Sequence, residues 1–307
     1  MDSANKQDAI VAEVTQGTTP SSPSFLLGRW TNIGGSPQRQ STRSPERRAD
    51  RMMSAMVTNL NGYQKTIGGV WVRDAANDVL LASLFNGAYA TNVLKNASTA
   101  SFFTLEEKYE GGATDLYRRA TGCQVDSLAL SFRLGEAIQT NWEIRHMGES
   151  VATSAIASST YTAPSPGYDP VSTVDVSVTS MFGLSSPKVM GLDMTITNKM
   201  ASLHSFGSAN PFGLSNGPFD VSGSLQVYLS AAADYSTFTT RQTGLTFNIT
   251  LGSVTNFKDK IEMGNVHAFN PDVSDPGATG QHMVTIQFSA AYYASDTAAI
   301  KLTRLVA

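Results

Sequence analysis

Apolar and polar residues alternate along several stretches of the chain. The clearest is 125–132, in which Val125, Leu128, Leu130 and Phe132 stand among polar residues. Stretches 171–178, 189–198 and 283–293 follow the same pattern. Successive side chains of a strand point to opposite faces of a sheet, so a period of two indicates a strand with one buried face. The pattern therefore predicts a mainly β chain.

A helical pattern interrupts the strands once in each half. Val79, Leu80, Leu81, Leu84 and Phe85 form an apolar stripe that ends before a glycine, and Asn77-Asp78 can cap its start. This predicts a helix over 77–85. The shorter stretch 231–238 is its expected counterpart in the second half.

The two halves repeat the same order of elements. Each has a glycine-containing strand, then the helical stretch, another strand, a loop and a further strand. Gly68 matches Gly223 and Gly122 matches Gly264, and the offset falls from 155 to 142 residues because the loops differ in length. A repeat on this scale predicts two similar units in one chain.

The predicted layout begins with a flexible arm, because the first residues are polar and rich in Ser, Thr and Pro. A Ser/Thr/Ala/Pro stretch near the middle predicts a linker. The predicted boundaries are a flexible N-terminal arm at 1–24, a first unit at 25–150, a linker at 151–170 and a second unit at 171–307.

Within the first unit, the polar stretch 34–51 has no apolar period and predicts a long surface loop. Asn61-Gly62 predicts a tight hairpin between the strands 52–60 and 64–72. The Gly/Ser/Asn/Pro stretch 205–218 is the second half's counterpart of the first loop.

The composition favours a protein covered by neighbours. Charged residues make up 15% of the 307 residues, against about a quarter in an average soluble domain. The net charge of −3 gives no general attraction to nucleic acid or anionic lipid. A single cysteine, Cys123, suits a reducing cytoplasm and is interpreted as a buried small apolar residue. We expect no signal peptide and no membrane span.

Motifs that carry chemistry are missing from the sequence. The four histidines have no metal-ligand spacing, and no phosphate-binding loop or nucleophile elbow occurs. Residues 272–277 are interpreted as a hairpin turn rather than a calcium loop. Glu106, Glu107 and Glu110 are interpreted as a solvated strand edge. We therefore expect neither enzymatic activity nor a cofactor.

The arginine-rich stretch allows two interpretations. Five arginines within 39–51 could neutralise phosphates of a nucleic acid. Two carboxylates are interleaved with them and no aromatic residue lies among them, which favours a solvated loop or a subunit contact through Arg–carboxylate pairs.

Several segments resemble the tail tube (major tail) proteins of long-tailed bacteriophages. In the first half the resemblance lies in Ser-Pro-Glu-Arg-Arg-Ala-Asp-Arg at 44–51, the Gly-Gly-centred strand, Asp-Val-Leu-Leu-Ala-Ser-Leu-Phe-Asn-Gly at 78–87, and the stretch 119–132. In the second half it lies in 194–198, 221–225, 235–238 and the closing segment 260–304.

The resemblance implies two tandem tail-tube-like β-sandwich domains, each with one short helix, that contribute strands to an inner β-barrel shared by a ring. Stacked rings would form a conduit for genomic DNA, which passes without tight binding. If rings of this family hold six tube domains, three chains with two each would close one ring; six chains with one tube domain each is the alternative.

Further expectations follow from the same resemblance. The expected partners are the chain itself, the tape measure protein and the tail terminator or tip proteins. The expected location is the virion tail, and the host cytoplasm during assembly, with no membrane. The candidate inter-subunit contacts are Arg39, Arg43, Arg47, Arg48, Arg51, Phe206 and Phe212. A carbohydrate- or receptor-binding β-sandwich module of a virion is the competing interpretation.

Overall fold

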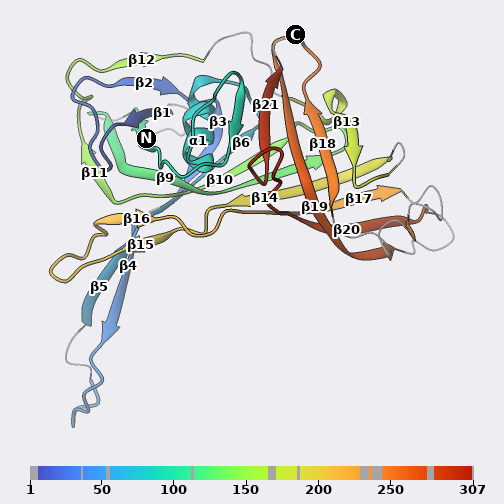
Figure 1. Cartoon of the computed structure of the whole chain (residues 1–307). Coiled ribbons are helices and arrows are strands. Elements are labelled where there is room, and N and C mark those ends of the chain that lie inside the picture. The colour runs from blue at the N-terminus through green and yellow to red at the C-terminus, as the bar shows by residue number, and fades with distance from the viewer. Residues whose placement is uncertain are drawn as a thin grey trace.

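The chain folds into a mainly β structure with one described α-helix, as the alternating pattern predicted (Figure 1). This computed structural model describes residues 6–35, 37–52, 56–111, 114–164, 171–184, 187–228, 235–236, 244–274 and 280–305. Among these residues, seventeen strands belong to one hydrogen-bonded sheet, and β4–β5 and β15–β16 form separate two-stranded pairs.

The first half contains twelve of the described strands and the helix. They are β1 (Lys6–Glu13), β2 (Ser24–Leu27), β3 (Trp30–Gly34), β4 (Gln38–Arg43), β5 (Met56–Gly62), β6 (Gln64–Val70), α1 (Ala75–Phe85), β7 (Val93–Lys95), β8 (Phe102–Tyr109), β9 (Leu116–Arg133), β10 (Gln139–Arg145), β11 (Gly148–Ala152) and β12 (Thr160–Thr162).

The second half contains the other nine described strands and a 3-10 turn. They are η1 (Thr173–Asp175), β13 (Ser177–Met181), β14 (Val189–Thr197), β15 (Ala201–Leu203), β16 (Gly213–Ser215), β17 (Asp220–Tyr228), β18 (Leu245–Leu251), β19 (Lys258–Ser274), β20 (Met283–Ala290) and β21 (Lys301–Leu305).

Eight strands lie side by side as the central part of the sheet, in the order β3-β6-β10-β9-β14-β17-β20-β19, and every neighbouring pair is antiparallel. The first four come from the first half of the chain and the last four from the second. The two halves meet where β9 pairs with β14, from Arg133 opposite Gly191 to Ser127 opposite Thr197. A smaller junction joins β7 to β21.

The strand pairings of the first half recur in the second. The long strand β9 pairs with β8, β10 and β11, and the long strand β19 pairs with β18, β20 and β21. β1 adds to β8 as β13 adds to β18. The pair β4–β5 is inserted between β3 and β6 as β15–β16 is inserted between β14 and β17.

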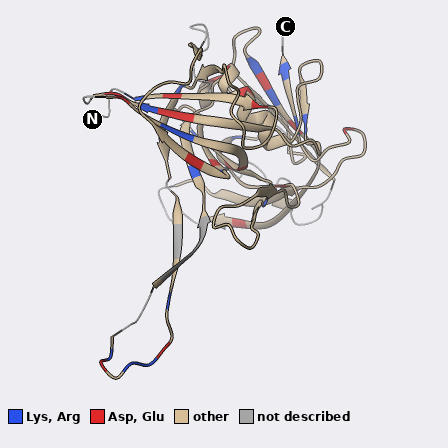
Figure 2. Cartoon of the chain, turned by 90° about the vertical axis from the view of Figure 1, so that its left-hand side faces the viewer, with Lys and Arg blue, Asp and Glu red and all other residues tan. Residues whose placement is uncertain are grey.

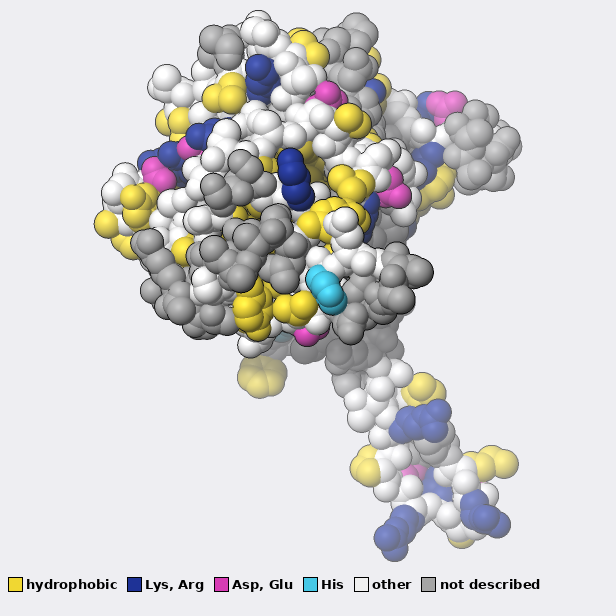
Figure 3. Space-filling view, turned by 90° about the vertical axis from the view of Figure 1, so that its right-hand side faces the viewer, with side chains coloured by type: hydrophobic (Ala, Val, Ile, Leu, Met, Phe, Trp, Pro, Cys, Tyr) yellow, Lys and Arg dark blue, Asp and Glu magenta, His cyan; other side chains and the backbone are white. Residues whose placement is uncertain are grey.

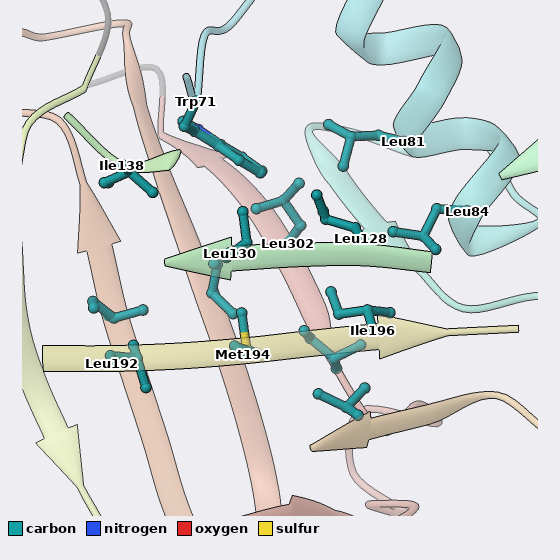
Figure 4. Packing of buried hydrophobic residues seen from close by; sticks show 14 of the residues in the cluster. Trp71, Leu81, Leu84, Leu128, Leu130, Ile138, Leu192, Met194, Ile196 and Leu302 are labelled. Carbon is teal, nitrogen blue, oxygen red and sulfur yellow. The ribbon is translucent and has the colours of Figure 1, made fainter. Parts of the chain in front are cut away.

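The hydrophobic core draws residues from both halves, and α1 contributes to its first-half part. Leu81 and Leu84 of α1 face Leu128 of β9 and Ile196 of β14 (Figure 4). Trp71 and Trp142 are buried in this core, as is Cys123. Burial raises the pKa of the Cys123 thiol, so the side chain is a buried apolar group as expected.

The helix confirms the helical pattern of the first half but starts one half-turn earlier than predicted. Asp74 caps it by accepting a hydrogen bond from the backbone of Asn77 at 2.7 Å. Asn86 ends it in the left-handed conformation, with φ of 49°. The helix expected over 231–238 lies outside the described residues, except for 235–236.

The expectation of a flexible arm at 1–24 is wrong for residues 6–13. These residues form β1, which pairs along its whole length with β8. Ile10 enters the main core, and the Glu13 carboxylate accepts hydrogen bonds from Gly17, Thr104 and Gly122. Only the centre of this strand is apolar, and the polar residues around it led to the prediction of a flexible arm.

Two further local predictions are wrong. Part of the expected surface loop 34–51 is strand β4, which pairs with β5. The Asn61-Gly62 hairpin does not form, because the chain continues from β5 into β6, and β6 pairs with β3 and β10 instead. Segment 151–164 of the expected linker lies against the first half, since β12 pairs with β2.

A buried ionic cluster ties five strands of the first half together. Lys65 of β6 is fully buried; it contacts Glu107 of β8 and lies 3.5 Å from Glu149 of β11. Lys6 of β1 lies 3.1 Å from Glu107, and Arg118 of β9 pairs with Glu149. Burial alone would raise the pKa of Glu107, but Lys65 and its hydrogen bonds outweigh burial and hold that pKa below its usual value.

Replacing Lys65 with methionine should destabilise the fold strongly, because it leaves two carboxylates in the interior without their central cation. We expect a loss of about 3–5 kcal/mol in the free energy of unfolding at pH 7, measured by urea denaturation. Because the pKa of Glu107 is lowered in the fold, this cluster's contribution is present at neutral pH and is lost as the pH falls through that lowered value.

The matched control is Lys260→Met, since Lys260 pairs with Glu262 at 2.7 Å in a more exposed position. Its cost should stay below about 1 kcal/mol. Equal losses for the two variants would contradict the role given to the buried cluster.

Candidate inter-subunit surfaces

A long two-stranded arm projects from the body of the molecule. It consists of β4, β5 and the segment between them, and it extends well beyond the other strands (Figure 1). The residues of β4 and β5 whose exposure is described include Ser41, Thr42, Arg43 and Met56, which are all exposed, and the two strands pair with each other. Five arginines predicted as contacts belong to this arm: Arg39 and Arg43 on β4, and Arg47, Arg48 and Arg51 beyond it.

The far end of the arm is charged and exposed (Figures 2 and 3). Arg48 pairs with Asp50 at 2.8 Å, and that pairing lowers the pKa of Asp50. Between Arg39 and Arg51, five arginines stand against two carboxylates, which leaves a net charge of +3. Met52 and Met56 are also exposed, at 71% and 61%. An extended, basic arm with exposed apolar side chains has the composition of a contact surface.

The second half carries a shorter arm, made of β15, β16 and the loop between them. Phe206 is fully exposed in this loop, and Phe212 is 60% exposed. The loop of the shorter arm contacts the base of the longer one, because the Tyr63 hydroxyl donates to the Asn210 side chain at 2.8 Å. The predicted contact residues therefore belong to two neighbouring projections.

The outward face of the central sheet is polar and nearly uncharged, a surface that the search for motifs missed. Its residues alternate with the core positions and are mostly Ser, Thr, Asn and Gln. They include Thr66 and Gly68 of β6, Gln139, Asn141 and Glu143 of β10, Ser127, Ala129 and Ser131 of β9, Asp193 and Thr195 of β14, Ser222, Ser224 and Gln226 of β17, and Thr285, Gln287 and Ser289 of β20.

The charges on this face are paired or hydrogen-bonded. Arg133 and Asp193 form an ion pair of 2.7 Å across the β9–β14 junction, and Ser131 donates to Asp193 at 2.8 Å. Glu143 accepts from Ser127 at 3.2 Å. At the end of the same strands Arg145 pairs with Asp126 at 2.7 Å. The alternation of polar residues in the sequence was the signal that could have identified this face.

Glu106 and Glu107 are not the solvated strand edge that the sequence predicted, whereas the Glu110 side chain is 45% exposed and pairs with Lys108. Glu106 and Glu107 are both about 1% exposed, because β1 covers the outer side of β8. Arg119 binds Glu106 at 2.5 Å, and the Tyr161 hydroxyl donates to the same carboxylate at 2.5 Å. These carboxylates belong to the internal ionic network.

The histidines are not gathered into a site. His146 is buried, and burial lowers its pKa to about 4. No group of three or more His, Cys, Asp or Glu residues in the described ranges is placed to hold a metal ion. Within those ranges no helix is both long and apolar enough to cross a membrane.

Comparison with known proteins agrees with these observations. No curated protein sequence matches the chain. The family model of the phage tail tube protein matches residues 3–292, which is nearly the whole chain. This match confirms the resemblance seen in the sequence, and the chain belongs to the phage tail tube protein family.

Proposed function

We propose that three copies of this chain close one ring of a phage tail tube, that each copy supplies two tube units, and that stacked rings conduct DNA into the host. The repeated strand order carries this proposal: β3-β6-β10-β9 in the first half corresponds to β14-β17-β20-β19 in the second. If a ring needs six units, three such chains complete it. Six chains with one tube unit each is the alternative arrangement.

The open sheet supports ring closure. Among the described residues, β3 pairs only with β6, and β19 beyond Val266 pairs only with β20. Such edges expose backbone donors and acceptors, and a closed barrel satisfies all of them. Rings that stack head to tail use heterologous contacts, which build an open-ended tube.

The outward face of the central sheet is suited to line the bore. DNA slides freely only where the wall does not bind its phosphates, and unpaired Lys or Arg would bind them. Arg133 is neutralised by Asp193, and most of the other side chains on this face are uncharged. The wall can therefore hydrate the passing DNA without holding it.

The arm of β4 and β5 is suited to join one ring to the next, with the shorter arm beside it. The arm is long, basic at its far end and exposed. As a phage tail tube protein the chain is a structural component of the virion tail. The partners in this proposal are further copies of the chain, the tape measure protein and the terminator and tip proteins, with assembly in the host cytoplasm.

Electron microscopy of the purified protein over a concentration series tests the ring. We expect hollow discs or tubes, with three chains per disc by mass measurement. Six chains per disc would leave the tube function in place and contradict two tube units per chain. A monomer at every concentration, with glycan binding in a screen, would favour the receptor-binding module.

Charge reversal in the arm tests its role in stacking. Arg43→Glu together with Arg47→Glu should raise the protein concentration needed for tubes at least about tenfold, which corresponds to about 1.4 kcal/mol. Both side chains are exposed, so the melting temperature of the monomer should change little. The control carries lysine at both positions and should assemble nearly normally. If the glutamate variant forms tubes at the same protein concentration as the unmodified chain, the arm has no part in the stacking contact.

A further inference from the structure

The long arm of β4 and β5 joins the body through two roots. The outgoing root is Gly35, which follows β3, and the returning root is Tyr63, which lies between β5 and β6. Shortly after the returning root comes Lys65, the fully buried cation that contacts Glu107 and lies 3.5 Å from Glu149. The arm is therefore attached to the body beside the buried ionic cluster.

The outgoing root lies directly against the backbone of β6. Gly35 has a φ of 105°, and a Cβ atom there would lie 2.4 Å from the carbonyl oxygen of Gln64 and 2.8 Å from the Cα of Lys65. Glycine alone tolerates such a close approach at this positive φ. Arg118 of β9 donates from Nη2 to the Gly35 carbonyl at 2.8 Å, and its Nε pairs with Glu149. One guanidinium thus links the ionic cluster to the outgoing root.

The returning root is held by an aromatic contact and by hydrogen bonds. Tyr63 is 9% exposed, and its ring centroid lies 5.0 Å from that of His146, which is fully buried. The backbone N–H of His146 also donates to the Tyr63 carbonyl at 3.3 Å. The Tyr63 hydroxyl donates to Asn210 in the loop of the shorter arm. This root is therefore fixed both to the body and to the second projection.

An arm of this shape needs such contacts to keep one direction. A two-stranded ribbon is only marginally stable alone, and it has no second layer of structure that fixes its orientation. The far end of this arm extends well away from the body, so a small rotation at the roots displaces that end widely (Figure 1). The direction of the arm is therefore decided at Gly35 and Tyr63.

We propose that Arg118 and Tyr63 are the positioning residues of the long arm. Arg118 transmits the geometry of the buried ionic cluster to the outgoing root, and Tyr63 couples the returning root to the shorter arm. The two arms then leave the body in one direction and move as a unit. Arms that are ordered before assembly lose less conformational freedom on binding, so tubes form at a lower protein concentration. This last consequence rests on the stacking role proposed above.

The type of side chain fits this task. Arg118 lies on β9 between β8 and β11, and its Nη1 lies 3.8 Å from Glu107. Arginine presents its N–H donors in a rigid plane, so it can bind carboxylates and a carbonyl oxygen at a fixed angle. The lysine ammonium is a compact charge on a flexible stem and does not fix that angle.

Arg118→Lys tests the outgoing root in the full-length protein, below the concentration at which it assembles. Spin labels on Arg43→Cys in the arm and Thr195→Cys in the body report their separation by double electron–electron resonance. Both positions are exposed, and Cys123 is fully buried and stays unlabelled. Lysine keeps the charge beside the ionic cluster but cannot also bond the outgoing root. The distance distribution should broaden by several ångströms, while the melting temperature should fall by only about 2–4 °C.

The matched control is Arg133→Lys, which makes the same substitution at the other end of the same strand. Arg133 pairs there with Asp193 at 2.7 Å. Its distance distribution should match that of the unmodified chain. Equal broadening in the two variants, or no broadening in Arg118→Lys, would overturn the role of Arg118.

Tyr63→Phe tests the link between the two arms. Phenylalanine keeps the ring against His146 and removes only the hydroxyl that reaches Asn210. Labels on Arg43→Cys and Phe206→Cys, one in each arm, should then give a broader distance distribution, because the arms move separately.

The matched control for this variant is Tyr161→Phe, since the Tyr161 hydroxyl donates to Glu106 of the internal network rather than to an arm. It should leave the distribution between the arms unchanged. An unchanged distribution in Tyr63→Phe would contradict the coupling of the arms.

Tube formation by the unlabelled variants separates this inference from the proposed function. Arg118→Lys should raise the protein concentration needed for tubes several-fold. If its arm distribution broadens while tube formation is unchanged, the positioning role stands and the stacking role of the arm is contradicted. If the unmodified chain forms no tubes, the proposed function is contradicted, and the measured distances still decide whether Arg118 and Tyr63 position the arms.

Discussion

Backbone hydrogen bonding at the edges of the sheet is the constraint on which the rest of this structure depends. A strand satisfies its donors and acceptors only when both of its sides are covered. Inside the chain this requirement joins the halves, because the last central strand of the first half, β9, has only β14 to cover its outer side. Among the described residues, the same requirement remains open at the outer side of β3 and at the part of β19 beyond Val266.

The interior of each half reinforces this arrangement with side chains. In the first half, Lys65, Glu107 and Glu149 lie where several strands converge, so the ionic cluster fixes the position of β6, β8 and β11 together. A buried ion pair contributes little net stability, but it is intolerant of misplacement. Trp71 adds a link between the halves by donating to Asp259 of β19 at 3.1 Å. These contacts fix β6, β8, β11 and the start of β19 relative to one another.

The sequence predicted the parts that depend on local pattern. Alternation at 125–132 and 189–197 gave β9 and β14, and the apolar stripe over 79–85 gave most of α1. The sequence-based prediction failed where a strand pairs with a segment that is distant along the chain. Residues 6–13 become a strand only because β8 offers an edge, and Glu106 is buried only because that strand is present. The sequence correctly indicated that the arginine-rich segment is exposed. It did not indicate the strands of this arm, because β4 and β5 form only by pairing with each other across the segment that separates them. The polar outward face of the central sheet carries no sequence motif, and it can be recognised only when the strands are set in register.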